Sequence, residues 1–232
     1  MSTTSASPPE AEAPGQAGSP APVKPRMRGV MHQYAFFVSL ITGAVLIFAA
    51  PTREATVAVS VYAGAIAGLF GVSALYHRLN WSPAARRRMR RLDHSMIFML
   101  IAGTYTPICL LALDGAWSVA ILSVVWGGAA AGIVLKLVWI DAPGWLVALV
   151  YVILGWAGTA ALPIITTNVG VGALLLILTG GVLYSVGAVV YARKRPDPVP
   201  AVFGYHEVFH TLVIAAAAVH YVAVVFFVLP RA

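Results

Sequence analysis

Residues 205–229 read YHEVFHTLVIAAAAVHYVAVVFFVL, an apolar run long enough to cross a membrane as one helix. A bilayer-spanning helix needs about 20 consecutive, mostly apolar residues. This run opens with two histidines and a glutamate and is apolar over most of its remaining length. Because ionisable groups are costly at membrane depth, the segment indicates a transmembrane fold with a polar site.

Apolar runs of the same kind fill most of the chain. Of its 232 residues, 60% are hydrophobic and 10% are charged, and the mean hydropathy is +0.86. Soluble domains average about 25% charged residues, so this composition does not supply a water-facing surface. The runs are separated by turn or charge signals at Pro51, 86–91, Asp114-Gly115, 141–144, Asn168 and 193–196. We predict an all-α polytopic membrane protein with seven transmembrane helices, near residues 34–50, 55–77, 95–113, 116–138, 144–163, 169–192 and 205–229.

The first residues differ in composition from the rest. Residues 1–28 are rich in Pro, Ala, Ser and Gly and have few large apolar side chains. Such a segment does not bury enough apolar surface to fold, so we interpret it as a disordered N-terminal tail. It is not a signal peptide, because neither basic charge nor an apolar run opens the chain. Residues 29–232 form one predicted seven-helix transmembrane domain.

Basic residues fall almost entirely on one side of the predicted topology. The chain has 15 Lys and Arg and a formal net charge of +7. Thirteen of the 15, within residues 24–28, 78–91, 136 and 193–195, lie on the side of the N-terminus. Positive residues favour the cytoplasmic side of a membrane. We therefore predict a multi-pass protein of the cell membrane with a cytoplasmic N-terminus and an external C-terminus, and we take the charge as topology and not as a nucleic-acid surface.

The segment Trp81–Leu92 holds five of these arginines. Ser82 fits a helix N-cap and Pro83 fits the first helical position. We predict a short basic helix on the inner leaflet, attracted by anionic lipid.

Three histidines are brought to one membrane depth by this topology. His77 ends the second span, and His206 and His210 open the seventh, all on the cytoplasmic side. His206 and His210 are four residues apart, so they share a helix face at ~6 Å of rise, which suits one metal ion. The string from His206 to His210 also matches H-E-x-x-H, in which two histidines bind zinc. We predict one Zn²⁺ bound by His77, His206 and His210, and the alternative is interfacial histidines bonded to backbone or lipid headgroups.

Other polar groups at this depth are candidates for catalytic roles. Three ligands leave the fourth position of a tetrahedral zinc site open, which is the pattern of catalytic sites. Asp93 opens the third span and is the candidate for proton transfer, and its alternative is an ion pair with an arginine just before it. Ser73 lies one turn from His77 and either supports the site or bonds its own i−4 carbonyl. Glu207 is a weaker candidate, because it is turned partly away and basic residues of the inner loops are available as partners.

The remaining histidines and the single cysteine carry less weight. His94 is expected to point elsewhere on its helix, and His32 carries no signal of its own. His220 lies ~21 Å beyond the start of the histidine pair, too far for the same ion, so we expect a structural hydrogen bond there. Cys109 stands alone inside an apolar run, which excludes a disulfide framework and a thiol metal cluster.

Motifs in the second, third and seventh predicted spans carry a family resemblance. They are Ser73-x-x-x-His77, Leu92-Asp-His-Ser95, and His206-x-x-x-His210 followed by Ala215–His220. Over about residues 27–230 the chain resembles the haemolysin III family, the bacterial branch of the progestin and adiponectin receptor superfamily. The resemblance implies seven helices with a cytoplasmic N-terminus. It also implies a zinc ion bound by the three histidines near the inner leaflet, with Asp93 contacting zinc through a water molecule and Ser73 in the site. The eukaryotic receptors have a neutral residue where this chain has Glu207, which argues against an obligatory base.

The resemblance leaves several functions open. The eukaryotic receptors are linked to hydrolysis of ceramide-like amides, so our first hypothesis is a zinc-dependent hydrolase of lipid amides or esters, active in membrane lipid homeostasis. The second is a receptor or sensor with structural zinc. The third, a cytolytic protein, rests on the family name alone, and an intramembrane protease ranks last because H-E-x-x-H lies in the final helix. Membrane lipids are the expected substrate or ligand.

Overall fold

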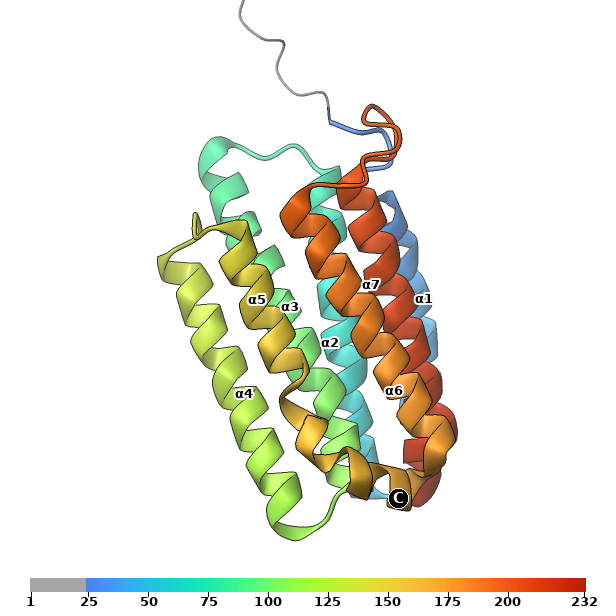
Figure 1. The fold of residues 1–232 in the computed structure, drawn as a ribbon. Coiled ribbons are helices and arrows are strands. Elements are labelled where there is room, and N and C mark those ends of the chain that lie inside the picture. Colours follow the sequence, from blue (N-terminus) through green and yellow to red (C-terminus); the bar gives the residue numbers. More distant parts are fainter. Residues whose placement is uncertain (1–23) are drawn as a thin grey trace, which may run out of the picture.

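The computed structural model describes residues 24–232 and shows a bundle of long helices (Figure 1). The helices are α1 (Val30–Phe48), α2 (Arg53–Arg78), α3 (Pro83–Ala112), α4 (Gly115–Val138), α5 (Gly144–Gly155), η1 (Ala157–Ala161), α6 (Leu162–Arg193), α7 (Tyr205–Ala223), η2 (Val224–Val228) and η3 (Leu229–Arg231). Apart from one isolated bridge, the described residues contain no β-structure, which confirms the all-α prediction for them. Residues 1–23 of the predicted tail lie outside the described part.

Six helical stretches of the described chain are long and apolar enough to cross a membrane, judged by length and composition. They are α1, α2, α3, α4, the continuous stretch Gly144–Arg193, and α7 with its extension to Arg231. A protein with several membrane helices is therefore supported, while the number of seven passages stays a prediction.

The stretch Gly144–Arg193 does not form one straight rod. At Gly170 the backbone has φ 86° and ψ 167°, a conformation that glycine adopts without the clash that a Cβ would cause. In this region the chain turns, and α6 runs back alongside α5 (Figure 1). The sequence predicts the break at Asn168, close to the observed turn at Gly170. The Nδ2 of Asn168 donates to the carbonyl of Ala112 (2.9 Å) and ties the turn to the end of α3.

The start of α3 follows its local signals. The Ser82 side chain accepts a hydrogen bond from the Ala85 amide (3.4 Å), and Pro83 occupies the first helical position. The helix then continues to Ala112. The separate basic helix predicted at 81–92 is therefore wrong in one respect: it is the first part of the third membrane helix, because no turn residue divides the arginines from the apolar run.

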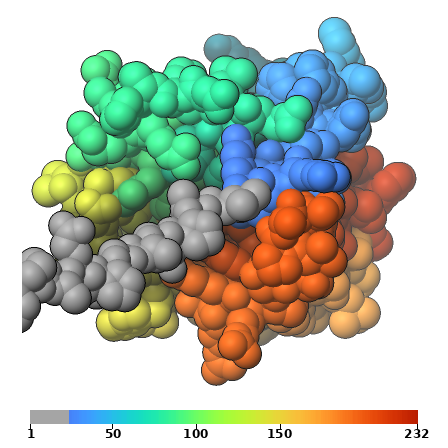
Figure 2. All heavy atoms as spheres, turned by 90° about the horizontal axis from the view of Figure 1, so that it is seen from above, coloured from blue at the N-terminus to red at the C-terminus, as the bar shows by residue number. Residues whose placement is uncertain are grey.

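The two ends of the bundle differ in charge. Residues 24–28 and the loops 79–82, 139–143 and 194–204 lie at one end, and the C-terminus lies at the other (Figure 1). Of the 15 Lys and Arg, all but Arg53 and Arg231 belong to segments at the first end, which we call the basic end. Figure 2 looks down on the basic end, where the first described residues, the segment around 80–90 and the segment before α7 meet.

Residues 24–28 are attached to this end, although the sequence placed them in the tail. The amides of Arg26 and Met27 donate to the carbonyls of Ala201 and Val202, each at 3.0 Å. The start of the described chain is thereby held against the segment that leads into α7.

Two buried apolar clusters hold the helices together. One joins α3, α4 and the first turns of α6 through residues such as Phe98, Val125 and Ile165, and the other joins α1, α2 and α7. Large apolar side chains also point outward, among them Phe48 (89% exposed) and Val138 (80% exposed). Extensive outward apolar surface is what a membrane protein presents to lipid.

Candidate metal centre

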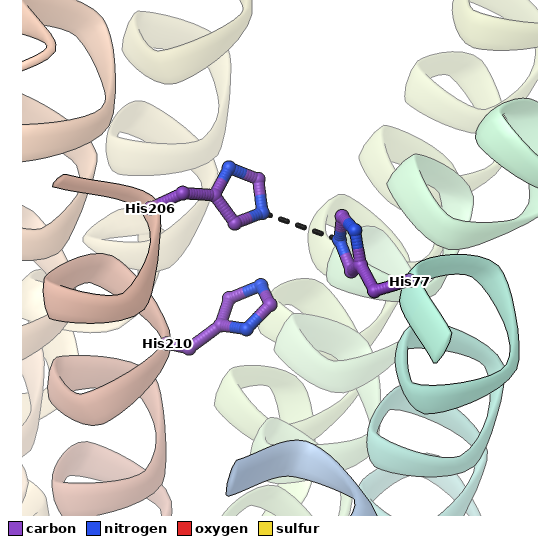
Figure 3. Close-up of side chains that lie close together, drawn as sticks. All are labelled: His77, His206 and His210. Atoms are coloured by element: carbon purple, nitrogen blue, oxygen red, sulfur yellow. Dashed lines mark hydrogen bonds between the residues drawn. The ribbon is translucent and has the colours of Figure 1, made fainter. Parts of the chain in front are cut away.

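Three histidines from two helices converge near the basic end (Figure 3). His77 lies in the last turn of α2, and His206 and His210 lie in the first turns of α7. One ring nitrogen of each lies within 4.8 Å of the others. The structure thus brings together the three residues that the sequence singled out as metal ligands.

Two of the donor atoms have the spacing that one small metal ion requires, and a nitrogen of His210 lies within 4.8 Å of both. The Nε2 atoms of His77 and His206 are 3.2 Å apart. Zinc binds imidazole nitrogen at ~2.0–2.1 Å, and tetrahedral geometry then separates two nitrogens by roughly 3.3 Å. Two of the three histidines are buried and His206 is half-buried. Imidazole ligands also favour zinc and other transition metals over magnesium or calcium.

A fourth histidine belongs to this site, which the sequence analysis missed. The ring of His32, from α1, stacks on the ring of His210 with centroids 3.8 Å apart and planes inclined by 13°. His32 is 2% exposed, and its Nε2 has no hydrogen-bond partner within the described residues. A signal existed, because residue 32 lies just before the first predicted span, on the side of the membrane where the three ligands were expected.

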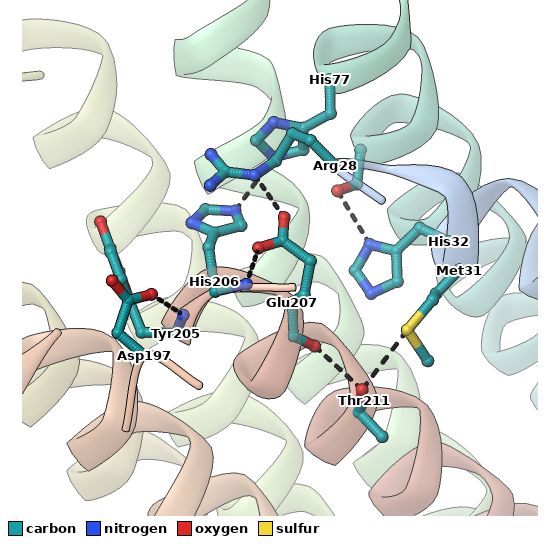
Figure 4. A network of polar contacts seen from close by, with 11 residues as sticks. Arg28, Met31, His32, His77, Asp197, Tyr205, His206, Glu207 and Thr211 are labelled. Carbon is teal, nitrogen blue, oxygen red and sulfur yellow. Dashed lines mark hydrogen bonds and ion pairs between the residues drawn. The ribbon is translucent and has the colours of Figure 1, made fainter. Parts of the chain in front are cut away.

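Ser73 reaches the centre through His32. Its Oγ lies 2.8 Å from Nδ1 of His32, and these contacts continue through the stacked ring to His210. The alternative bond to the i−4 carbonyl of Leu69 is not among the contacts of the described chain. Figure 4 shows this network of polar contacts around His32 and the start of α7.

Asp93 and His94 both border the cavity at the histidines. Oδ2 of Asp93 lies 3.4 Å from Nδ1 of His94, whose Nε2 lies 3.4 Å from the Tyr191 hydroxyl. Among the described residues no arginine pairs with Asp93, since Arg90 instead contacts Asp141. The expectation that His94 points elsewhere is therefore wrong. Neighbouring helical residues differ by about 100° in direction, and this cavity is wide enough to meet both.

Glu207 is held by the protein at both carboxylate oxygens (Figure 4). Oε1 lies 2.5 Å from Nε of Arg28, and Oε2 accepts a hydrogen bond from the Gly204 amide at 2.9 Å. The first contact agrees with the predicted pairing with a basic residue, and the second satisfies a backbone donor just before α7. The side chain is 1% exposed and does not border the cavity at the histidines, which argues against a role as base.

A cavity of about 500 Å³ leads from the histidines into the bundle between α2, α3, α5, α6 and α7. Its mouth carries positive charge from Arg28, Arg86 and Arg90. Burial, and then the charges of Arg86, Arg78 and Arg28, lower the pKa of Lys24 beside it. Further in, the wall is largely apolar, with residues such as Leu100, Val147 and Val213. Its size falls within the ~300–1,000 Å³ of ligand pockets.

His220 lies at the far end of this cavity and does not join the metal-binding cluster. Its Nε2 lies 3.0 Å from the carbonyl oxygen of Ile177 in α6. The predicted structural hydrogen bond is confirmed.

Comparison with known proteins gives one consistent match. Residues 21–221 match the family described as haemolysin-III related. Hemolysin-3 of Bacillus cereus is 34% identical over 182 residues, which cover 78% of this chain and 80% of the relative. The Hemolysin-3 homolog of Bacillus subtilis (strain 168) is 37% identical over 137 residues, 59% of this chain and 61% of the relative. The human monocyte to macrophage differentiation factor is 24% identical over 168 residues, 71% of this chain and 67% of the relative.

Proposed function

The chain belongs to the haemolysin III-related family, and we propose that it is a zinc-dependent hydrolase that cleaves an amide or ester bond of a membrane lipid. One observation carries this proposal: three converging histidines and Asp93 border one end of a cavity whose interior is largely apolar. A zinc ion with three protein ligands keeps a position open for water or substrate. The apolar interior suits an acyl chain.

Each polar residue has a role in this proposal. His77, His206 and His210 would hold the ion, which when bound lowers the pKa of a water and polarises a carbonyl oxygen. His32 orients His210 by stacking, and Ser73 holds His32. Asp93 accepts a proton and returns it to the leaving group.

The cleavage is tested with purified, zinc-loaded protein and a panel of ceramides, other lipid amides and lipid esters. Mass spectrometry of released fatty acid should show product with the wild type and none with His77→Ala. Zinc-loaded wild type that releases no acid from any lipid contradicts the proposal.

We also propose seven membrane passages with the N-terminus in the cytoplasm. The stretch Gly144–Arg193 has 50 residues, about 75 Å of helix, against ~30 Å of hydrocarbon. The turn around Gly170 supports two passages there, and the charge of the basic end supports a cytoplasmic position for it. Reporters fused to each terminus should report opposite sides, and the same side for both contradicts the topology.

A second candidate is a receptor in which zinc is structural. The observation behind it is that the ligands come from both α2 and α7, so one ion would join two helices. Such a protein changes conformation with lipid and forms no product, which the same panel distinguishes. A cytolytic function rests here only on the names of the two bacterial relatives.

A further inference from the structure

The deep end of the cavity contains polar side chains with and without partners. Most are satisfied: Thr104 donates to the Leu100 carbonyl, Tyr105 to that of Gly155, Trp156 to the Ser185 hydroxyl and Ser185 to the Gly181 carbonyl. The exceptions are the Tyr184 hydroxyl of α6 and Nδ1 of His220 in α7, both buried and without a partner within residues 24–232. Their ring centroids are 5.6 Å apart. At the deep end, the unused hydrogen-bonding capacity of the described residues therefore lies on these two side chains.

The partner that would satisfy these atoms has a definite chemistry. A backbone carbonyl only accepts, so Nε2 of His220 carries the hydrogen that it shares with Ile177. In the neutral ring Nδ1 is then an acceptor, while the Tyr184 hydroxyl is able to donate. A group between them that donates to one and accepts from the other is a hydroxyl, and a carbonyl or a methylene does not serve both.

The ring of His220 is positioned by a glycine of α6. A Cβ built on Gly180 of α6 would lie 2.2 Å from Nε2 of His220, so the ring fills the space that this glycine leaves. Tyr62 carries another unpartnered buried hydroxyl but does not border the cavity, whereas Tyr184, which packs against the same α1–α2–α7 cluster, does.

The depth of the pair matches one leaflet of a bilayer. His220 follows His210 by ten residues on α7, which is about 15 Å of helix. Half of a hydrocarbon core of ~30 Å is the same length. A lipid with its head at the histidines would place the far part of its chain beside Tyr184 and His220.

We infer that the cavity binds an amphiphile whose hydrocarbon tail carries a hydroxyl group near its far end, held between Tyr184 and His220. This rests on the proposed lipid-binding function and names its substrate class. The polar pair recognises the tail, and the histidine cluster binds the head.

Two probes that differ only in the tail test this: palmitic acid and its ω-hydroxy derivative. Their dissociation constants are measured by displacement of a fluorescent fatty acid from purified protein, both zinc-loaded and after chelation. We expect the ω-hydroxy acid to bind about tenfold more tightly in both forms, the gain of one or two net hydrogen bonds. A derivative with the hydroxyl near the carboxylate should gain nothing.

Matched variants assign the preference to the pair. Tyr184→Phe removes only the hydroxyl, and His220→Phe keeps a ring but removes the Nδ1 acceptor, so each should abolish most of the tenfold preference. Tyr221→Phe is the control, because its hydroxyl donates to the Thr42 carbonyl and the residue does not border the cavity. A preference that survives in both cavity variants overturns the inference.

Equal affinity of wild-type protein for the two probes also overturns it, and shows that a resident water satisfies the pair. This result is distinct from failure of the hydrolase. A tail preference without lipid cleavage refutes the proposed reaction and leaves the inference standing, whereas cleavage without a tail preference does the reverse.

Discussion

The two ends of the cavity treat buried polar atoms differently. At the metal end polar side chains contact one another: Ser73 contacts His32, Glu207 contacts Arg28, and Asp93 lies near His94. Nε2 of His32 and Nδ1 of His94 have no hydrogen-bond partner within the described residues. At the deep end Tyr184 and His220 lie side by side with unused atoms. The first end is thus assembled largely by contacts within the protein, and on our inference the second is completed by a ligand hydroxyl.

The largest effect is expected from the two carboxylates of the metal end, which the structure holds in different ways. Asp93→Asn should lower lipid cleavage by about 10²–10⁴-fold, because the amide keeps the shape but takes no proton. Zinc should remain bound. Glu207→Gln is the comparison variant: its oxygen still accepts from the Gly204 amide, but its NH2 group loses the ion pair with Arg28, so a lower melting temperature is expected. It should cleave lipid at close to the wild-type rate.

The opposite pattern, with Glu207→Gln inactive and Asp93→Asn active, would restore the base role that H-E-x-x-H indicates. Loss of zinc from Asp93→Asn would instead make Asp93 a support for the metal and not a proton acceptor.

A smaller effect is expected on zinc affinity when His32, the ring that stacks on His210, is replaced. His32→Ala removes the ring that stacks on His210 and should weaken zinc binding by about 10–100-fold, the usual effect of losing a residue that orients a ligand. His32→Phe keeps a stacked ring and should weaken it less. Competition with a chromogenic zinc chelator measures each affinity. If Ser73 acts only through His32, the Ser73→Ala and His32→Ala effects will not add.

Additive losses, or His32→Ala with unchanged affinity, would remove His32 from the centre.

The last change concerns the deep end and is expected to affect stability and not zinc binding or cleavage. Gly180→Ala places a methyl group against His220 and should destabilise the protein by about 1–3 kcal/mol, the usual cost of overpacking. Gly127→Ala, in α4, is the control, because its added Cβ would meet no atom within 4 Å. Thermal unfolding in detergent compares them. Equal melting temperatures would mean that the ring of His220 moves freely.

Much of this arrangement was predictable from the sequence. The apolar runs gave the helices, and their alternation gave the common depth of His77, His206 and His210, because topology fixes depth. The same depth applied to His32, yet its contact with His210 depends on the rotation of α1 about its axis. That rotation is set by packing against α2 and α7, and the pattern of apolar residues along the chain does not reveal it. The tail boundary at residue 28 failed for a similar reason, since residues 24–28 are held by backbone bonds to residues 201–202.

The continuity of α3 and the partners of Glu207 show the same limit. A charged segment next to an apolar run has no periodic signal that tells one helix from two. The pairing of Glu207 with a basic residue was foreseen, but Arg28 was one of several candidates.

Whether three histidines share one zinc ion is decided by metal analysis of purified protein. We expect one zinc per chain in the wild type, its loss in His210→Ala, and its retention in His220→Gln, which lies outside the cluster. Equal zinc in wild type and His210→Ala, or a wild type that takes up no zinc from a zinc-containing buffer, would contradict the metal centre.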